Sequence, residues 1–289
     1  MRHWLRGLSM AVGALSALGL SAPAIAESAR DERLVVAGGC ATEIVYALGA
    51  GDRVVAVDST SAWPPEARDL PRIGYVRALP VEGILSMEPD RLLAVAEAGP
   101  STAIDKLRAA MPVDVLPPLR DPRALPDQIR RVAAHLDLEE RGKALADNLE
   151  ARLAEIPAGV GTEAAPSVLI LLAAGGNQLL AGGANTSADA LLDALGLRNA
   201  AGALESFKPM SRESLLQIDA DLIVIAETAP GAFDPTAWPA LAHTPAGKAN
   251  RVLVRDAMYL LGFGPRVIDA MQELRAAVVD PNFVAWKRS

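Results

Sequence analysis

The stretch EGILSMEPDRLLA, residues 82–94, decides the fold, because ESLLQIDADLIVI in residues 213–225 repeats its pattern. When Glu82 is aligned with Glu213 without gaps, an aspartate falls at the same place in both stretches, at Asp90 and Asp221. An apolar run follows each aspartate, and such a run between turn residues is typical of a buried strand. The chain is therefore expected to hold two similar units, the alternative being a chance recurrence of common residues.

Strand-like and helix-like segments alternate on both sides of these stretches. Short apolar runs predict strands at residues 33–37, 54–57, 91–95, 113–116 and 168–172. Helical patterns follow over residues 42–48 and 101–111, and a helix is expected up to Gly196 in the second half. Regular alternation of strand and helix is typical of parallel β-α-β units. Both halves are therefore expected to be α/β lobes.

Helical periodicity replaces this alternation between the two halves. Helices are expected over residues 124–136 and 139–156, and the second has leucines four residues apart. We therefore predict an α/β fold with two Rossmann-like lobes, joined by a single long backbone helix, and a ligand cleft between the lobes. The expected divisions are an N-terminal lobe (27–120), a helical crossing and linker (121–166) and a C-terminal lobe (167–289). A single stiff crossing predicts limited closure of the lobes.

The N-terminal segment, residues 1–26, has the layout of a secretory signal peptide. Basic residues precede the apolar run 8–20, and Ala24-Ile25-Ala26 is a small-x-small cleavage site. A membrane anchor is the alternative, but the run is shorter than the roughly 20 residues that span a bilayer. The layout predicts export to the periplasm.

The charge of the chain limits its partners. Residues 1–26 contain two of the 28 basic residues and none of the 35 acidic ones, so their removal changes the formal charge from −7 to −9. An acidic chain of this kind is a poor partner for nucleic acid and suits a soluble protein that meets basic patches. The only cysteine, Cys40, is expected to be a small buried hydrophobe in a monomer without disulfides.

Several segments resemble one protein family. TEIVYALG (42–49) resembles the first helix of the helical-backbone (cluster A, class III) periplasmic binding proteins. RIGYVR (72–77), EGILSMEPD (82–90) and YLLGFGPR (259–266) are similar to the haemin-binding branch of that family, the HmuT, ShuT and PhuT type. The resemblance covers nearly all of residues 33–279. It implies a protein that captures ferric haem b and delivers it to an inner-membrane ABC permease with a cytoplasmic ATPase.

The resemblance also implies a haem site. Haem needs an axial ligand, apolar walls and cations for its propionates, and tyrosinate is a known ligand of haem iron. Tyr75 matches the family's axial ligand, and Arg77 would favour the phenolate by its charge. In the alignment that matches Glu82 with Glu213, Arg77 falls on Lys208, so Lys208 and Met210 are candidates for the opposite wall or for ordinary loop packing.

Further ligands are harder to find. Some members of the family add a histidine, but only His135 and His243 follow the predicted signal peptide, and both are expected to be solvated. Arg266 is interpreted either as a propionate partner or as part of the start of the last helix.

The resemblance further implies how the partner docks. In this family, one exposed glutamate on each lobe meets a basic pocket of a dimeric permease, and Glu82 and Glu213 hold equivalent places in the repeat. Each precedes an apolar pair, Ile84-Leu85 or Leu215-Leu216, which is expected to be buried under its helix. Surface carboxylates that favour the helix dipole are the alternative.

Other functions stay open. A siderophore- or cobalamin-binding protein of the same fold is the nearest alternative. A metal-ion carrier of the same superfamily needs several histidine or carboxylate ligands, and only two histidines follow the predicted signal peptide. Neither G-x-S-x-G nor H-E-x-x-H occurs, and Gly49-Ala50-Gly51 lacks the third glycine of a dinucleotide motif. We therefore expect a binding protein and no enzyme.

Overall fold

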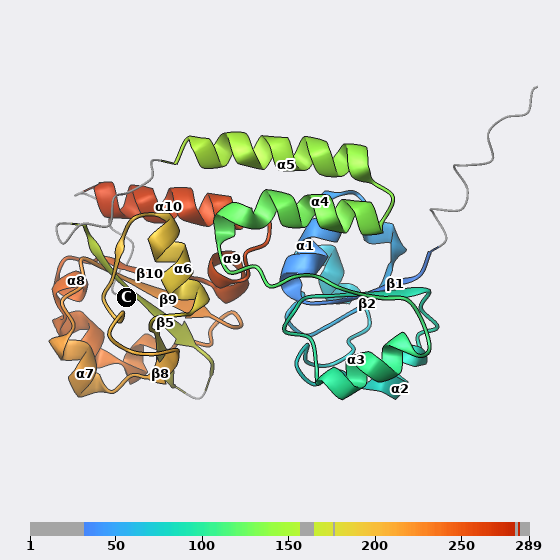
Figure 1. Ribbon diagram of the computed structural model, residues 1–289. Coiled ribbons are helices and arrows are strands. Elements are labelled where there is room, and N and C mark those ends of the chain that lie inside the picture. Colours follow the sequence, from blue (N-terminus) through green and yellow to red (C-terminus); the bar gives the residue numbers. More distant parts are fainter. Residues whose placement is uncertain (1–31, 157–164, 176, 281–282, 284–289) are drawn as a thin grey trace, which may run out of the picture.

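Two β-sheets form the centres of the two lobes (Figure 1). The computed structural model describes residues 32–156, 165–175, 177–280 and 283, so the predicted signal peptide and most of the predicted linker lie outside the described residues. The first sheet has the order β2-β1-β3-β4 and is parallel throughout. Its strands are β1 (Leu34–Ala37), β2 (Val54–Val57), β3 (Arg91–Ala94) and β4 (Val113–Val115).

The second sheet has the order β10-β9-β5-β6-β8, and β7 also pairs with β5. Its strands are β5 (Ser167–Ala173), β6 (Leu179–Gly182), β7 (Arg198–Asn199), β8 (Phe207–Pro209), β9 (Leu222–Glu227) and β10 (Val252–Asp256). The α-helices are α1 (Gly39–Ala47), α2 (Val81–Leu85), α3 (Ser101–Arg108), α4 (Leu125–His135), α5 (Glu139–Ala154), α6 (Ser187–Ala194), α7 (Arg212–Gln217), α8 (Pro245–Lys248), α9 (Ala257–Leu261) and α10 (Val267–Val279). Five short 3-10 helices are η1 (Gly51–Arg53), η2 (Pro65–Asp69), η3 (Pro122–Ala124), η4 (Pro235–Ala237) and η5 (Pro239–His243).

The repeat seen in the sequence is also a repeat of structure. β3 lies parallel to β1 and β9 lies parallel to β5, each reached through the short helix that opens the repeated stretch. The carboxylate of Asp90 accepts a 2.7 Å hydrogen bond from the backbone N–H of Arg33, just before β1. Asp221 accepts an equivalent 2.7 Å bond from Ser167 at the start of β5. The repeated aspartate therefore ties the first strand of each lobe to its neighbour.

The second lobe departs from the expected parallel β-α-β pattern. β6 runs antiparallel to β5, and β8 runs antiparallel to β6. Gly175 and Asn177, in the turn between β5 and β6, have φ angles of 90° and 58°. Glycine and asparagine tolerate this left-handed backbone, which lets the chain reverse directly into a hairpin. The helix expected up to Gly196 is present as α6, but a hairpin that was not predicted comes between it and β5.

The helical crossing was predicted well. α4 and α5 lie along one side of the molecule, and α5 runs from the first lobe toward the second (Figure 1). Among the leucines of α5, Leu149 is buried, while Leu145 and Leu153 are half-buried against the core. Arg152 of α5 forms an ion pair with Asp269 of α10, so α10 contacts the helical crossing. Within the described part of the chain, no helix combines the length and the apolar character that a membrane span requires.

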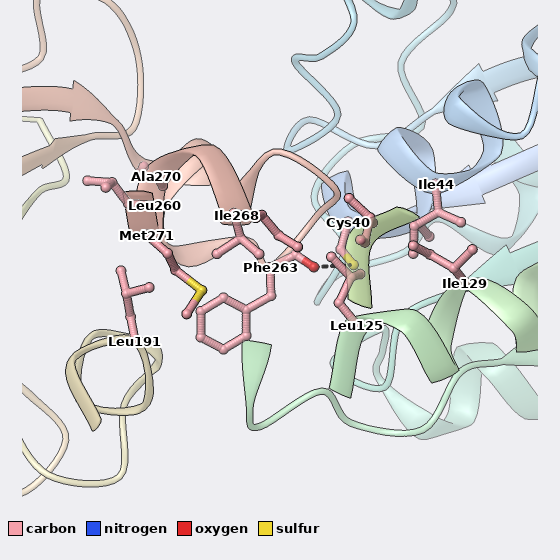
Figure 2. Packing of buried hydrophobic residues seen from close by; sticks show 14 of the residues in the cluster. Cys40, Ile44, Leu125, Ile129, Leu191, Leu260, Phe263, Ile268, Ala270 and Met271 are labelled. Atoms are coloured by element: carbon pink, nitrogen blue, oxygen red, sulfur yellow. Dashed lines mark hydrogen bonds between the residues drawn. The ribbon is translucent and has the colours of Figure 1, made fainter. Parts of the chain in front are cut away.

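The hydrophobic core continues from one lobe into the other. Side chains of α1 and α4 meet those of α6, α9 and α10 in one buried cluster (Figure 2). Cys40 of α1 is buried there, and its thiol donates a 3.3 Å hydrogen bond to the carbonyl of Phe263 (Figure 2). Burial raises the pKa of Cys40, so the thiol stays protonated and packs as expected. The two-lobed α/β fold is therefore confirmed, and its two lobes share one buried hydrophobic cluster.

Candidate functional site

Tyr75 lies on a loop that the fold holds in place. Ile73 and Val76 are buried on either side of it, and Gly74 between them has a φ of 90°. The carbonyl of Gly74 accepts a 2.7 Å bond from Ser59, and Val76 accepts a 3.0 Å bond from Gly99. Because the neighbours are anchored inward, the Tyr75 side chain stays 50% exposed and Arg77 is exposed as well.

The other two tyrosines are poorer sources of a phenolate. Burial raises the pKa of Tyr46, which packs against the core. Burial, followed by the charge of Glu273, raises the pKa of Tyr259 to about 12. The Tyr259 hydroxyl donates a 3.4 Å hydrogen bond to that carboxylate. Only three tyrosines occur in the chain, so Tyr75 is the exposed phenol that could meet a ligand.

The histidines lie elsewhere. The Nδ1 atom of His135, at the end of α4, lies 3.2 Å from a carboxylate oxygen of Asp114. His243 is exposed at the end of η5. Across residues 32–156, 165–175, 177–280 and 283, no three His, Cys, Asp or Glu side chains gather in a way that could hold a metal ion.

The matching loop of the second lobe carries Lys208 and Met210. Lys208 is exposed on β8, whereas Met210 is 7% exposed and packs in the core of the second lobe. Over the residues that the structure describes, no hydrogen bond or ion pair joins either side chain to Tyr75 or Arg77. Met210 lines an open pocket of about 330 Å³, together with Asn177, Gln178, Ser211, Arg212, Glu213 and Trp238.

Arg266 joins the two lobes. Its guanidinium donates a 2.6 Å hydrogen bond to Glu43 of α1, whose side chain is only 4% exposed. The same guanidinium lies over the rings of Trp63, 4.5 Å from the centroid, and Tyr259, at 5.5 Å. Arg266 immediately precedes α10, so it lies at the start of the last helix, and its closest partner is Glu43 across the lobes.

Glu43 was missed by the sequence analysis. Burial raises the pKa of this carboxyl, and its bond to Arg266 opposes that rise without cancelling it. The signal was present, because Glu43 is the only charged residue of α1. A carboxylate in such a helix needs a cationic partner, but the sequence does not say which one.

Glu82 and Glu213 occupy equivalent, exposed places on α2 and α7. Both helices lie at the edge of the molecule opposite α4, α5 and α10 (Figure 1). Ile84 and Leu215 are fully buried beneath these helices, as expected. The expected burial was wrong for the second residue of each pair, because Leu85 is 36% and Leu216 is 49% exposed.

Comparison with solved structures shows that the chain is similar to several proteins named as heme-binding. The periplasmic heme-binding protein BhuT, solved in complex with two hemes, is 35% identical with a TM-score of 0.77, over 88% of this chain and 100% of that one. RhuT from Roseiflexus sp. RS-1, in apo form, is 35% identical with a TM-score of 0.79 and the same coverage. HutB of Vibrio cholerae is 30% identical, with a TM-score of 0.73 over 86% and 99% of the two chains.

Sequence comparison adds a different set of relatives. The vitamin B12-binding protein of Vibrio cholerae serotype O1 is 39% identical over 77 residues, so this chain spans only 28% of that relative's length. The corresponding protein of Pectobacterium carotovorum is 25% identical over 228 residues, which are 77% of this chain and 76% of the relative. A family model described as Periplasmic binding protein matches residues 34–259. The chain therefore belongs to the periplasmic binding protein family.

Proposed function

We propose that this chain binds ferric haem b between its lobes and delivers it to an ABC permease dimer in the inner membrane. The observation that carries the proposal is the half-exposed Tyr75 on a loop anchored by Ile73 and Val76. The similar solved proteins BhuT, RhuT and HutB, all named as heme-binding, support the same ligand. Export by the predicted signal peptide and a monomeric state in the periplasm belong to the proposal.

Each site residue has a stated role in this proposal. Tyr75 supplies the phenolate that coordinates ferric iron. Arg77, exposed two residues later, favours that phenolate by its positive charge. Lys208 is an exposed cation of the second lobe that suits a propionate, and Met210 is proposed as an apolar contact on the wall of that lobe.

Cobalamin is the second candidate ligand, and the vitamin B12-binding relatives are the observation that favours it. A siderophore remains a third. The three ligands differ in what they need from the protein. Ferric haem needs an axial ligand, whereas cobalamin and most iron–siderophore complexes arrive with the metal already coordinated. The exposed phenol therefore favours haem.

A competition experiment tests the ligand. The mature protein is titrated with haemin, cyanocobalamin and a ferric siderophore, and binding is followed by quenching of tryptophan fluorescence. We expect saturable binding of haemin with an affinity at least about a hundredfold above the other two, a difference of roughly 2.7 kcal/mol. Tighter binding of cyanocobalamin would assign the chain to the other branch.

Docking to the permease through Glu82 and Glu213 belongs to the same proposal. Two like charges at a fixed separation match a partner with two-fold symmetry, and such exposed charges mainly set orientation and association rate. We expect the double variant Glu82→Ala and Glu213→Ala to bind haem normally and to lose stimulation of the transporter's ATPase. Normal stimulation, or loss of haem binding, would contradict this assignment.

A further inference from the structure

Two exposed leucines stand at equivalent places in the two lobes. Leu85 is 36% exposed on α2 and Leu216 is 49% exposed on α7. The alignment that matches Glu82 with Glu213 also matches these two leucines. The residue before each of them, Ile84 or Leu215, is 0% exposed. Each short helix therefore buries one apolar residue and shows the next one to solvent, in the same way in both lobes.

Each leucine lies on the same side of its helix as a glutamate. Glu82 precedes Leu85 by three positions and Glu213 precedes Leu216 by three, and residues at this spacing are neighbours on a helix surface. Both helices lie at the edge of the molecule opposite the crossing (Figure 1). We call α2 and α7 the lobe tips. Each lobe tip thus presents one carboxylate beside one apolar side chain.

The carboxylates are available to a partner. Within the part of the chain that the structure describes, the Glu82 side chain makes no hydrogen bond or ion pair. Hydrogen bonds, first from its own backbone N–H and then from Ser211, lower the pKa of Glu213, so this carboxylate stays ionised near neutral pH. If two copies of the chain met through these helices, the Glu82 and Glu213 carboxylates would face like charges, which is unfavourable at an interface. The charge therefore suits a basic partner.

We propose that Glu82 with Leu85, and Glu213 with Leu216, form a two-part docking surface for a two-fold symmetric membrane partner. Each half of that partner offers a cation next to an apolar contact. The inference rests on the proposed docking to a permease and extends it by giving the leucines a separate task. The glutamates speed and orient association, whereas burial of the leucines slows dissociation.

Binding kinetics separate the two tasks. The haem-loaded protein is flowed over nanodiscs that hold the cognate permease with its ATPase, at several salt concentrations. For Leu85→Ala with Leu216→Ala we expect dissociation about tenfold faster for each leucine, with an unchanged salt dependence. For Glu82→Gln with Glu213→Gln we expect slower association and a weaker salt dependence. Alanine favours helix, so the leucine variants should fold normally.

The matched control is Val279→Ala, because Val279 is a 66% exposed aliphatic residue at the end of α10, away from both tips. It should bind like the wild type. Leucine variants that dissociate at the wild-type rate, while the glutamate variants fail, would overturn this inference and leave the proposed docking intact. Wild-type protein that does not bind the nanodiscs would overturn both. Self-association of the wild type that the leucine variants abolish would assign the surface to a second copy instead.

Discussion

At the scale of single residues, the ion pair of Glu43 with Arg266 is a direct polar contact between the lobes. One carboxylate oxygen of Glu43 and the Nε of Arg266 are buried without a hydrogen-bond partner among the described residues. An incompletely satisfied buried pair of this kind adds little to stability, because the loss of hydration offsets the attraction. We infer that the pair fixes how the lobes meet more than it strengthens the fold.

This interpretation predicts a pH dependence. The pKa of Glu43 is raised by burial in the folded protein, so protonation favours the folded state. Its contribution to stability is full below the unfolded pKa of about 4.3 and is lost as pH rises through the folded pKa. The Glu43→Gln variant has no carboxyl group at this position, so it does not lose stability in this way as pH rises. We therefore expect the variant to gain stability relative to the wild type between pH 4 and pH 8.

Denaturant unfolding of both proteins across that pH range is the measurement. A stability difference that stays constant with pH would mean that the attraction of Arg266 cancels the effect of burial on the pKa of Glu43. A difference that turns against the glutamine variant as pH rises would mean that the attraction outweighs burial.

The sequence analysis found the residues whose signals are local. Asp90 and Asp221 were visible as a repeat, and each ties the start of its lobe's first strand. Tyr75 was selected by its match to the family's axial ligand, and its role stays a prediction. Glu43 pairs with a residue 223 positions away, and no local pattern reveals such a distant partner.

At the scale of elements, the long and strongly periodic segments were predicted best. α4 and α5 begin and end within two residues of the predicted bounds. The short strands β6 and β8 were missed, because four and three residues give too little pattern for a prediction. Their positions depend on pairing with β5 and with each other, which is a tertiary effect.

The short helices α2 and α7 show a similar limit. They have five and six residues, so each makes less than two turns and can bury only a narrow face. Two adjacent leucine or isoleucine side chains lie about 100° apart on a helix, and only one of them can face the sheet below. The exposed leucines follow from this geometry once the helix length is known.

At the scale of the whole molecule, the shared core limits motion. Buried residues of α1 and α4 pack directly with those of α9 and α10, and closing the lobes like a hinge would have to break these contacts (Figure 2). Two polar contacts beside this core also join the lobes. They are the hydrogen bond from Cys40 to Phe263 and the ion pair of Glu43 with Arg266. The ligand site is therefore expected to be largely preformed.

Solution scattering with and without haemin tests this expectation. We expect the radius of gyration to change by less than about 1 Å, the size of backbone change that preorganised complexes show. A large compaction on binding would show that the lobes move as separate bodies despite their common core.

The central claim is that Tyr75 coordinates ferric haem, and one absorption experiment tests it most directly. Haemin is titrated into the wild type, Tyr75→Phe and the control Tyr46→Phe, in which a half-buried tyrosine outside the site loses the same hydroxyl. We predict a Soret band with the charge-transfer features of a tyrosinate complex in the wild type and in Tyr46→Phe. Tyr75→Phe should lose those features and bind haemin more than about tenfold more weakly, since even the outer partners of metal ligands contribute about 10–100-fold. Identical spectra and affinities for Tyr75→Phe and the wild type would contradict the account.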